Sequence, residues 1–194
     1  MQDPVSGFKR LVEALDNLSI RYMVGGSLAS SVHGVFRSTN DIDIVADIRE
    51  DHLSRLTDEL APDFYADLDA MREALHNGRP FNLIYYTSSY KFDIFPLPGD
   101  AYYQSQLERS EPKEITLGGT ETVKCRVATA EDTILAKLVW YRRGGEQSER
   151  QWADLRGILS VQGERLDEAY LRRWAQHLGV EDLLERLLSQ KDNP

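Results

Sequence analysis

The stretch YMVGGSLASSVHGVFRSTNDIDIVAD, residues 22–47, decides the fold of this chain. Its first three residues are apolar and predict a short strand, which ends at the Gly-Gly-Ser turn at residues 25–27. A segment of small residues that suits a short helix follows, and residues 41–45 then predict a second strand. Alternate side chains of a strand point to opposite faces, so we expect Asp41 and Asp43 to share one face.

The paired aspartates and the glycine turn together predict a ligand. Two ionised carboxylates on one strand face repel each other, and a divalent cation with oxygen ligands, Mg²⁺ or Mn²⁺, would compensate them. A glycine turn at a helix N-terminus offers backbone N–H groups to an anion. Each feature alone also fits an ordinary role, because Asp-x-Asp occurs at turns and solvated edges and Ser27 suits a helix N-cap. Their combination predicts a nucleoside triphosphate bound with a divalent cation.

Two segments of this stretch, GGSLA at residues 25–29 and RSTNDIDI at residues 37–44, resemble the signature of the polymerase-beta-like nucleotidyltransferases. The chain is most similar to the minimal bacterial members, among them the AbiEii-like group, which includes toxins of toxin–antitoxin systems. The resemblance implies an enzyme of phosphorus-group transfer. Such an enzyme moves a nucleoside monophosphate from a nucleoside triphosphate to an acceptor hydroxyl or phosphate.

The resemblance also implies roles for residues of the stretch. A Gly-Ser turn binds the triphosphate in that superfamily, which implies nucleotide binding by Gly25, Gly26 and Ser27. Two strand aspartates hold metal ions there, which implies that Asp41 and Asp43 are catalytic metal ligands. A third carboxylate on a neighbouring strand completes the site.

Asp93 is the acid inside an apolar and aromatic segment, residues 90–95, that predicts a later strand. A carboxylate in such a strand costs free energy unless it is paired or bound to a metal ion. The resemblance implies that Asp93 is the third metal ligand, which would also draw the proton from the acceptor hydroxyl. Arg37 is open to two interpretations. It is either a surface arginine that pairs with a carboxylate or a residue that orders the loop around the nucleotide.

A second match lies about 100 residues further on, in the run EDTILAKLVWYRRGGEQSERQWADLRGIL at residues 131–159. It predicts two helices, and Lys137 falls on the apolar stripe of the first. This lysine either snorkels at the edge of the stripe or places its ammonium on the triphosphate. The run again resembles the AbiEii-like group. By that resemblance Lys137 contacts phosphate, Asp154 orients Lys137 or another basic group, and Arg150 supports the nucleotide or the helix pair.

Strand and helix patterns mix up to residue 127, and the remainder is wholly helical. With the resemblance, this predicts an α+β fold, in which a nucleotidyltransferase-type mixed β-sheet is flanked by helices and followed by a C-terminal helical bundle. We expect residues 1–127 to form the nucleotidyltransferase core with the metal and triphosphate site. Residues 128–194 would form a helical part that packs over this core.

Composition excludes several classes of protein. The 194 residues contain no apolar run of about 18 residues and no signal-peptide core, so we expect a cytoplasmic protein without a membrane partner. Cys125 is the only cysteine, which excludes an internal disulfide. The net charge of −9 opposes non-specific nucleic-acid binding. A local basic track remains open through four arginines: Arg142, Arg143, Arg150 and Arg156.

Three functions remain open on the sequence. The first is a nucleotidyltransferase that acts on RNA or tRNA, as a toxin with an antitoxin protein as partner. The second is a nucleotidyltransferase that modifies a small molecule, such as an aminoglycoside, or a protein side chain. The third is a non-catalytic nucleotide-binding module. Ser27, Asp41, Asp43 and Lys137 argue against the third, because a module without catalysis has no chemical need for all four.

Overall fold

The computed structural model describes residues 4–39, 41–88, 90–117 and 121–190, so Asn40 of the RSTNDIDI segment lies outside the described residues. The chain divides into two compact units. The first, here called the sheet unit, comprises Met1–Val24 and Thr39–Val127. The second, the helical unit, comprises Gly25–Ser38 and Ala128–Pro194. The segment that carries the Gly-Ser turn therefore belongs with the C-terminal helices.

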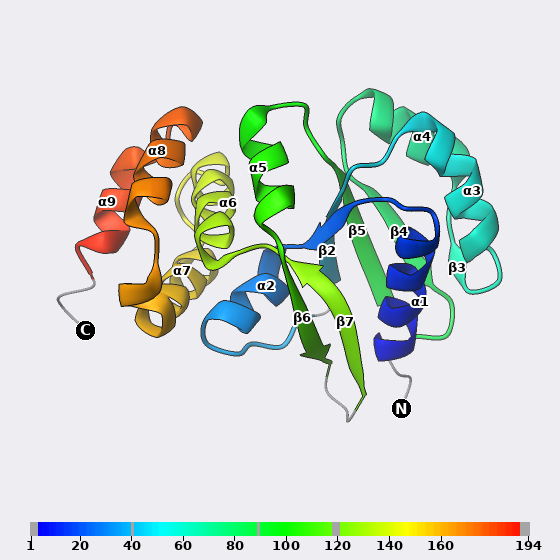
Figure 1. The fold of residues 1–194 in the computed structure, drawn as a ribbon, viewed down its shortest axis with the longest axis horizontal. Helices are drawn as coiled ribbons and strands as arrows, with labels where there is room; N and C mark the ends of the chain where they lie inside the picture. The colour runs from blue at the N-terminus through cyan, green and yellow to red at the C-terminus, as the bar shows by residue number, and fades with distance from the viewer. Residues whose placement is uncertain (1–3, 40, 89, 118–120, 191–194) are drawn as a thin grey trace. The chain divides into compact units, whose positions relative to one another are not determined.

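The sheet unit is built on a seven-stranded mixed sheet with the strand order β3-β4-β5-β2-β1-β7-β6 (Figure 1). The strands are β1 (Tyr22–Val24), β2 (Asp41–Ala46), β3 (Phe64–Tyr65), β4 (Phe81–Tyr85), β5 (Tyr90–Pro96), β6 (Glu111–Thr116) and β7 (Thr122–Val127). The β2–β5 and β1–β7 pairs are parallel, and the other neighbouring pairs are antiparallel. The parallel β2–β5 pair lies inside the sheet and joins the aspartate strand to the strand of Asp93.

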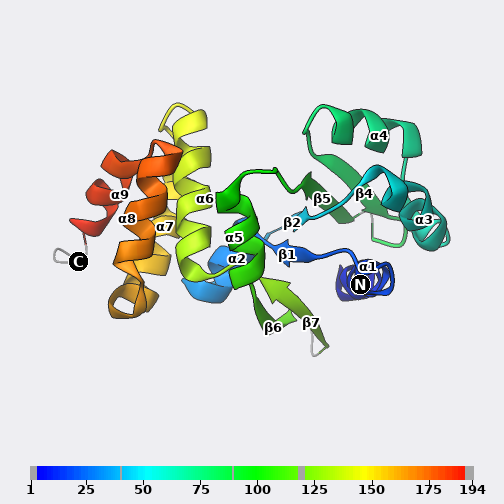
Figure 2. The same ribbon diagram turned by 45° about the horizontal axis from the view of Figure 1, so that its top comes forward.

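The helices of the sheet unit, over its described residues, are α1 (Pro4–Asn17), α3 (Glu50–Leu60), α4 (Leu68–His76) and α5 (Ala101–Arg109). Helix α1 packs against α3 and β7, and α3 packs against α4 (Figure 2). The apolar stripe of α1 explains this placement, because Phe8, Leu11 and Leu15 recur at helical spacing and are fully buried. Phe8 stacks on Phe92 of β5 with ring centroids 6.4 Å apart. These contacts cover one face of the sheet with apolar side chains.

The helical unit contains α2 (Gly26–His33), α6 (Ala130–Arg143), α7 (Glu149–Gln162), the short 3-10 helix η1 (Gly163–Arg165), α8 (Glu168–Leu178) and α9 (Glu181–Leu188). Helix α2 packs against α6 and α7, and α6 packs against α7 and α8. Thr129 caps α6 by accepting a hydrogen bond from the backbone N–H of Asp132, and Ser148 caps α7 in the same way. The packing places α2 and the two helices of the second sequence match in one unit.

The predicted α+β fold with a mixed sheet and C-terminal helices is confirmed. The two-residue strand β3 is an element that the sequence pattern did not predict, because it is too short to show a period. None of the helices in the described part of the chain is long and apolar enough to cross a membrane. The two expected domains remain a prediction, and the contacts instead group residues 25–38 with the C-terminal helices.

Candidate functional site

Three aspartates lie on one face of the parallel β2–β5 pair. In β2, Asp41 and Asp43 are partly exposed while Ile42 is fully buried, as the alternation predicts. The register pairs Asp43 with Asp93 of β5. Residues that lie opposite each other on neighbouring strands point to the same face, so the three carboxylates share one face of the sheet.

The acidic face, as we call Asp41, Asp43, Asp93 and Lys91, contains one basic side chain. The ammonium of Lys91 lies 2.9 Å from Oδ2 of Asp93, and the register places Lys91 opposite Asp41. The hydrogen bond to Asp93 raises the pKa of the Lys91 ammonium; partial burial opposes this shift, and the charges of Asp41 and Asp43 reinforce it. Lys91 is thus held charged among three acids.

The two outer aspartates differ in how their oxygens are satisfied. Asp41 Oδ1 accepts a hydrogen bond of 2.7 Å from the hydroxyl of Thr39, whose carbonyl accepts one of 2.6 Å from the hydroxyl of Tyr90. Oδ1 of Asp93 is buried and has no hydrogen-bond partner among the described residues. Because a buried carboxylate oxygen without a partner costs free energy, this atom is suited to a ligand that supplies a positive charge.

The acidic face fits a divalent metal ion by its chemistry. Carboxylate oxygens are the ligands that Mg²⁺ and Mn²⁺ prefer, and the buried Oδ1 of Asp93 is an oxygen that still needs a partner. In the described part of the chain, however, no group of three or more His, Cys, Asp or Glu side chains is arranged to hold an ion. The charge that contacts Asp93 is the ammonium of Lys91.

The Gly-Ser turn lies in the helical unit and opens α2. Gly25 is the N-cap and Gly26 the first helical residue, with a φ of 56° in the left-handed region that favours glycine. The N-cap role predicted for Ser27 is therefore wrong, because the helix begins one residue earlier. The hydroxyl of Ser27 instead accepts a hydrogen bond of 2.7 Å from Nη2 of Arg37.

A second cluster of charges, here called the basic cluster, consists of Ser27, Arg37, Lys137 and Asp154. Arg37 reaches Asp154 through two bonds, from Nε to Oδ1 at 3.2 Å and from Nη2 to Oδ2 at 3.1 Å. Lys137 donates to Oδ2 of Asp154 at 2.8 Å. One carboxylate thus holds two cations, and the cluster carries a net positive charge.

Burial and pairing oppose each other at Asp154. Burial alone would raise the pKa of its carboxyl, but the hydrogen bonds and charges of Arg37 and Lys137 outweigh this and lower the pKa. Lys137 is 8% exposed, so its ammonium is held by Asp154 and does not snorkel to water. Arg37 pairs with a carboxylate, as its first interpretation held, and also orders the turn by holding Ser27.

The loop between α2 and Arg37 is fixed by short contacts. The hydroxyl of Ser31 donates to the carbonyl of Arg37 at 3.0 Å and accepts from its backbone N–H at 3.2 Å. A Cβ atom on Gly34 would lie 2.8 Å from the backbone of Gly157 and Ile158 on α7, so only glycine allows this approach. The backbone of Arg37 is therefore placed before its side chain binds Asp154.

The structure gathers the predicted site residues in two groups, one within each unit. Gly26, Ser27, Arg37, Lys137 and Asp154 gather in the helical unit, and the three aspartates gather in the sheet unit.

Arg150 is exposed one turn before Asp154 on α7 and takes no part in the bonds of the basic cluster. Lys91 was missed, although its position two residues before Asp93 on a strand was a signal that both share a face.

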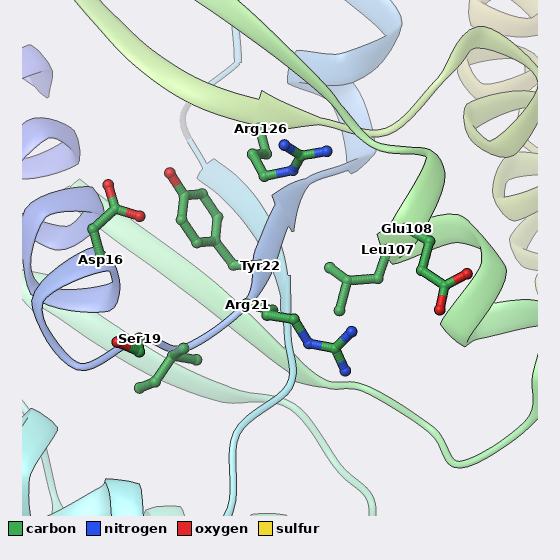
Figure 3. A pocket seen from close by; sticks show the side chains of 8 residues that line it. Asp16, Ser19, Arg21, Tyr22, Leu107, Glu108 and Arg126 are labelled. Atoms are coloured by element: carbon green, nitrogen blue, oxygen red, sulfur yellow. The ribbon is translucent and has the colours of Figure 1, made fainter.

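A separate cavity of about 420 Å³ lies in the sheet unit (Figure 3). None of the predicted site residues lines this cavity. The residues that line it are Asp16, Ser19, Ile20, Arg21, Tyr22, Leu107, Glu108 and Arg126. Both arginines already have partners, because Arg21 pairs with Asp47 at 2.6 Å and Arg126 donates to Ser110 at 2.8 Å. The predicted site residues therefore lie in the acidic face of the sheet unit and in the helical unit that carries the basic cluster.

No family model and no curated protein sequence matches the chain. Two solved structures of ANT(2'')-Ia are similar to it. The solution structure of this antibiotic-resistance factor aligns with a TM-score of 0.53 and 15% identity, over 94% of this chain and 96% of the other. The crystal structure of ANT(2'')-Ia in complex with adenylyl-2''-tobramycin aligns with a TM-score of 0.52 and 16% identity, over 89% and 97%.

The chain therefore has the fold of ANT(2'')-Ia along nearly its whole length. The nucleotidyltransferase-type fold expected from the sequence is confirmed. Membership of the AbiEii-like group stays a prediction, as do the metal ions and the roles of the site residues.

Proposed function

We propose that this chain is a metal-dependent nucleotidyltransferase, which transfers a nucleoside monophosphate from a nucleoside triphosphate to an acceptor hydroxyl. The observation that carries the proposal is the placement of Asp41, Asp43 and Asp93 on one face of two adjacent strands, within a nucleotidyltransferase fold. Two strands far apart in the sequence supply these three acids, and their register sets Asp43 opposite Asp93.

In this proposal Asp41, Asp43 and Asp93 hold Mg²⁺ or Mn²⁺. When bound, such ions would neutralise charge on the triphosphate and lower the pKa of the acceptor hydroxyl. Asp93 would accept the proton of that hydroxyl, because its Oδ1 has no hydrogen-bond partner in the described residues.

The basic cluster supplies the phosphate ligands of the proposal. The Gly25-Gly26 turn presents the N-terminal N–H groups of α2, which suit a phosphate. Arg37 and Lys137 are held beside this turn by Asp154 and would balance the charge of the triphosphate. The acceptor oxygen attacks the α-phosphorus, the bond from that phosphorus to the bridging oxygen breaks, and pyrophosphate leaves with the electron pair.

We favour a small molecule with hydroxyl groups as the acceptor, in the class of the aminoglycosides. ANT(2'')-Ia is an antibiotic-resistance factor whose crystal structure contains adenylyl-2''-tobramycin, and the similarity spans nearly the whole of both chains. A net charge of −9 suits a cationic acceptor and opposes a polyanion. Arg142, one of the four arginines of the basic track, is already paired with Asp182 at 2.6 Å and Glu146 at 2.8 Å.

RNA or tRNA is the second candidate acceptor. Arg143, Arg150 and Arg156 are exposed in the helical unit and would supply a phosphate track. This candidate also rests on the resemblance to the AbiEii-like toxins, and with it comes the prediction of an antitoxin protein as partner. The labelling experiment described next also tests RNA as the acceptor.

The experiment measures whether labelled phosphate from a nucleoside triphosphate is transferred to an acceptor. The protein is incubated with Mg²⁺ or Mn²⁺, with each triphosphate labelled at the α- or the γ-phosphate, and with tobramycin-like aminoglycosides or total bacterial RNA. We expect α-label but not γ-label on the aminoglycoside, and no label with Asp43→Ala. Label on RNA would instead favour the toxin function. If no acceptor is labelled although the triphosphate binds, the proposal of catalysis is wrong and the non-catalytic module remains.

A further inference from the structure

We propose that Lys91 is a built-in counter-ion, whose ammonium competes with a divalent cation for the carboxylate of Asp93 and so sets the affinity of the acidic face for metal. The inference rests on the proposed function, because it concerns the same three aspartates. It adds a residue that neither the motif nor the fold similarity assigns.

Lys91 lies on the same strand as Asp93, β5. Residues 91 and 93 are two apart on a strand and therefore share a face. The register places Lys91 opposite Asp41, and Asp93 opposite Asp43. The ammonium thus lies on the face that carries all three carboxylates, 2.9 Å from Oδ2 of Asp93.

Lys91 and Asp93 differ in their exposure to solvent. The side chain of Lys91 is 45% exposed, while that of Asp93 is 15% exposed. The ammonium can therefore leave for water by rotating a flexible stem, whereas the carboxylate stays where the strand holds it. Oδ1 of the Asp93 carboxylate has no hydrogen bond among the described residues, so a cation that binds this carboxylate would find an oxygen that still needs a partner.

The acidic face carries an excess of negative charge. Three aspartates and one lysine leave the acidic face with a formal charge of −2, which a single divalent cation would neutralise. An ion that contacts Asp93 would approach the ammonium of Lys91 and repel it. Metal binding and the Lys91–Asp93 pair are therefore alternatives for the same carboxylate. Removal of the lysine charge should tighten metal binding.

The test measures Mn²⁺ directly, by titration calorimetry and by the electron paramagnetic resonance signal of the free ion, without nucleotide. We expect Lys91→Met to lower the dissociation constant for Mn²⁺ by about 3- to 10-fold, since it removes a partly exposed competing charge. Lys113→Met is the matched control. Lys113 lies 2.8 Å from Glu111, also two residues away on a strand, and its loss should leave Mn²⁺ binding unchanged.

The outcomes separate this inference from the proposed function. If the wild type and Lys91→Met bind Mn²⁺ equally, or the variant binds it more weakly, the lysine is no competitor while the metal site stands. If neither protein binds Mn²⁺, the metal site of the proposed function fails and the inference fails with it. Circular dichroism and thermal unfolding of each variant show whether it is folded, and Lys91→Gln repeats the measurement in a second folded variant.

Discussion

The acidic face of the sheet unit and the basic cluster of the helical unit are opposite in composition and in how well their charges are satisfied. On the acidic face one lysine faces three aspartates, and Oδ1 of Asp93 has no hydrogen bond within the described residues. In the basic cluster one aspartate faces two cations, and both oxygens of Asp154 are bonded. The same ion-pair chemistry is thus incomplete in one region and complete in the other.

The difference separates a carboxylate that can still take a ligand from one that holds other groups in place. A carboxylate whose oxygens are all bonded fixes its partners and has little capacity for a further ligand, as at Asp154. A carboxylate with an unbonded oxygen beside other acids is poised to take a cation. This contrast supports the proposed role of Asp93 in the chemistry of the site, and it fits the proposal that Asp154 positions Arg37 and Lys137.

The largest expected effect is on catalysis, from Asp93→Asn. The amide keeps the shape of the side chain but removes the charge, so we expect kcat for nucleotidyl transfer to fall by about 10³-fold or more. The free energy of unfolding should change by less than about 1 kcal/mol, because the lost partner Lys91 is 45% exposed. Labelled transfer and urea unfolding measure the two quantities.

Asp58→Asn is the control for this variant, because Asp58 is exposed on α3 and outside the acidic face. It should leave kcat unchanged. Full activity of Asp93→Asn would show that the third carboxylate has no part in the reaction.

The next effect is on stability, from Asp154→Ala. The side chains of Asp154 and Lys137 are each 10% exposed, so the truncation leaves a buried ammonium without its partner. We expect the free energy of unfolding to fall by about 3 kcal/mol, since breaking a buried pair costs roughly this amount. Urea unfolding followed by tryptophan fluorescence checks the value.

Asp182→Ala is the matched control for the pair at Asp154. Arg142 donates to both oxygens of Asp182 at 2.6 and 2.7 Å, but the aspartate side chain is 72% exposed. Solvent screens such a pair, and we expect little change in stability. Equal losses in the two variants would refute the contrast between a complete buried cluster and a surface pair.

Much of the fold could be predicted from the sequence. Apolar periodicity marked α1 and the two strands of the aspartates, and the period of two placed Asp41 and Asp43 on one face. These features are local, so neighbouring residues are enough to show them. The strand β3 was not predicted, because a strand of two residues is too short to show an alternating pattern.

The candidate site was predictable as residue types but not as an arrangement. No local pattern shows that β2 pairs with β5 in the register that sets Asp43 beside Asp93. Nor does any local pattern show that Arg37 binds Asp154, which lies 117 residues further along the chain. Register and long-range packing depend on the whole chain, which explains why the position of Lys91 opposite Asp41 and the Gly34–Gly157 approach were found in the structure alone.

A smaller effect is expected from Gly34→Ala, which tests whether the loop geometry supports the basic cluster. The added Cβ would lie 2.8 Å from backbone atoms of Gly157 and Ile158, which cannot move as a side chain can. We expect a loss of about 1–3 kcal/mol in the free energy of unfolding, the usual cost of overpacking. Urea unfolding measures it, and Gly99→Ala is the control because its Cβ would meet open space. Equal stability of the two variants would mean that the loop is not fixed by this approach.

The smallest expected effect is the pH dependence that Asp154 adds to stability. Its carboxyl pKa is lowered in the folded protein, because hydrogen bonds from Arg37 and Lys137 outweigh the opposing effect of burial. A group with a lowered folded pKa stabilises the protein above its unfolded pKa, about 4 for aspartate, and loses this contribution as pH falls through the folded value. We therefore expect the wild type to exceed Asp154→Asn in unfolding free energy at pH 6, with the excess shrinking below about pH 4. Other carboxylates titrate in both proteins and cancel in the difference, so an excess that stays constant with pH would show that Asp154 is not the ionised centre of the basic cluster.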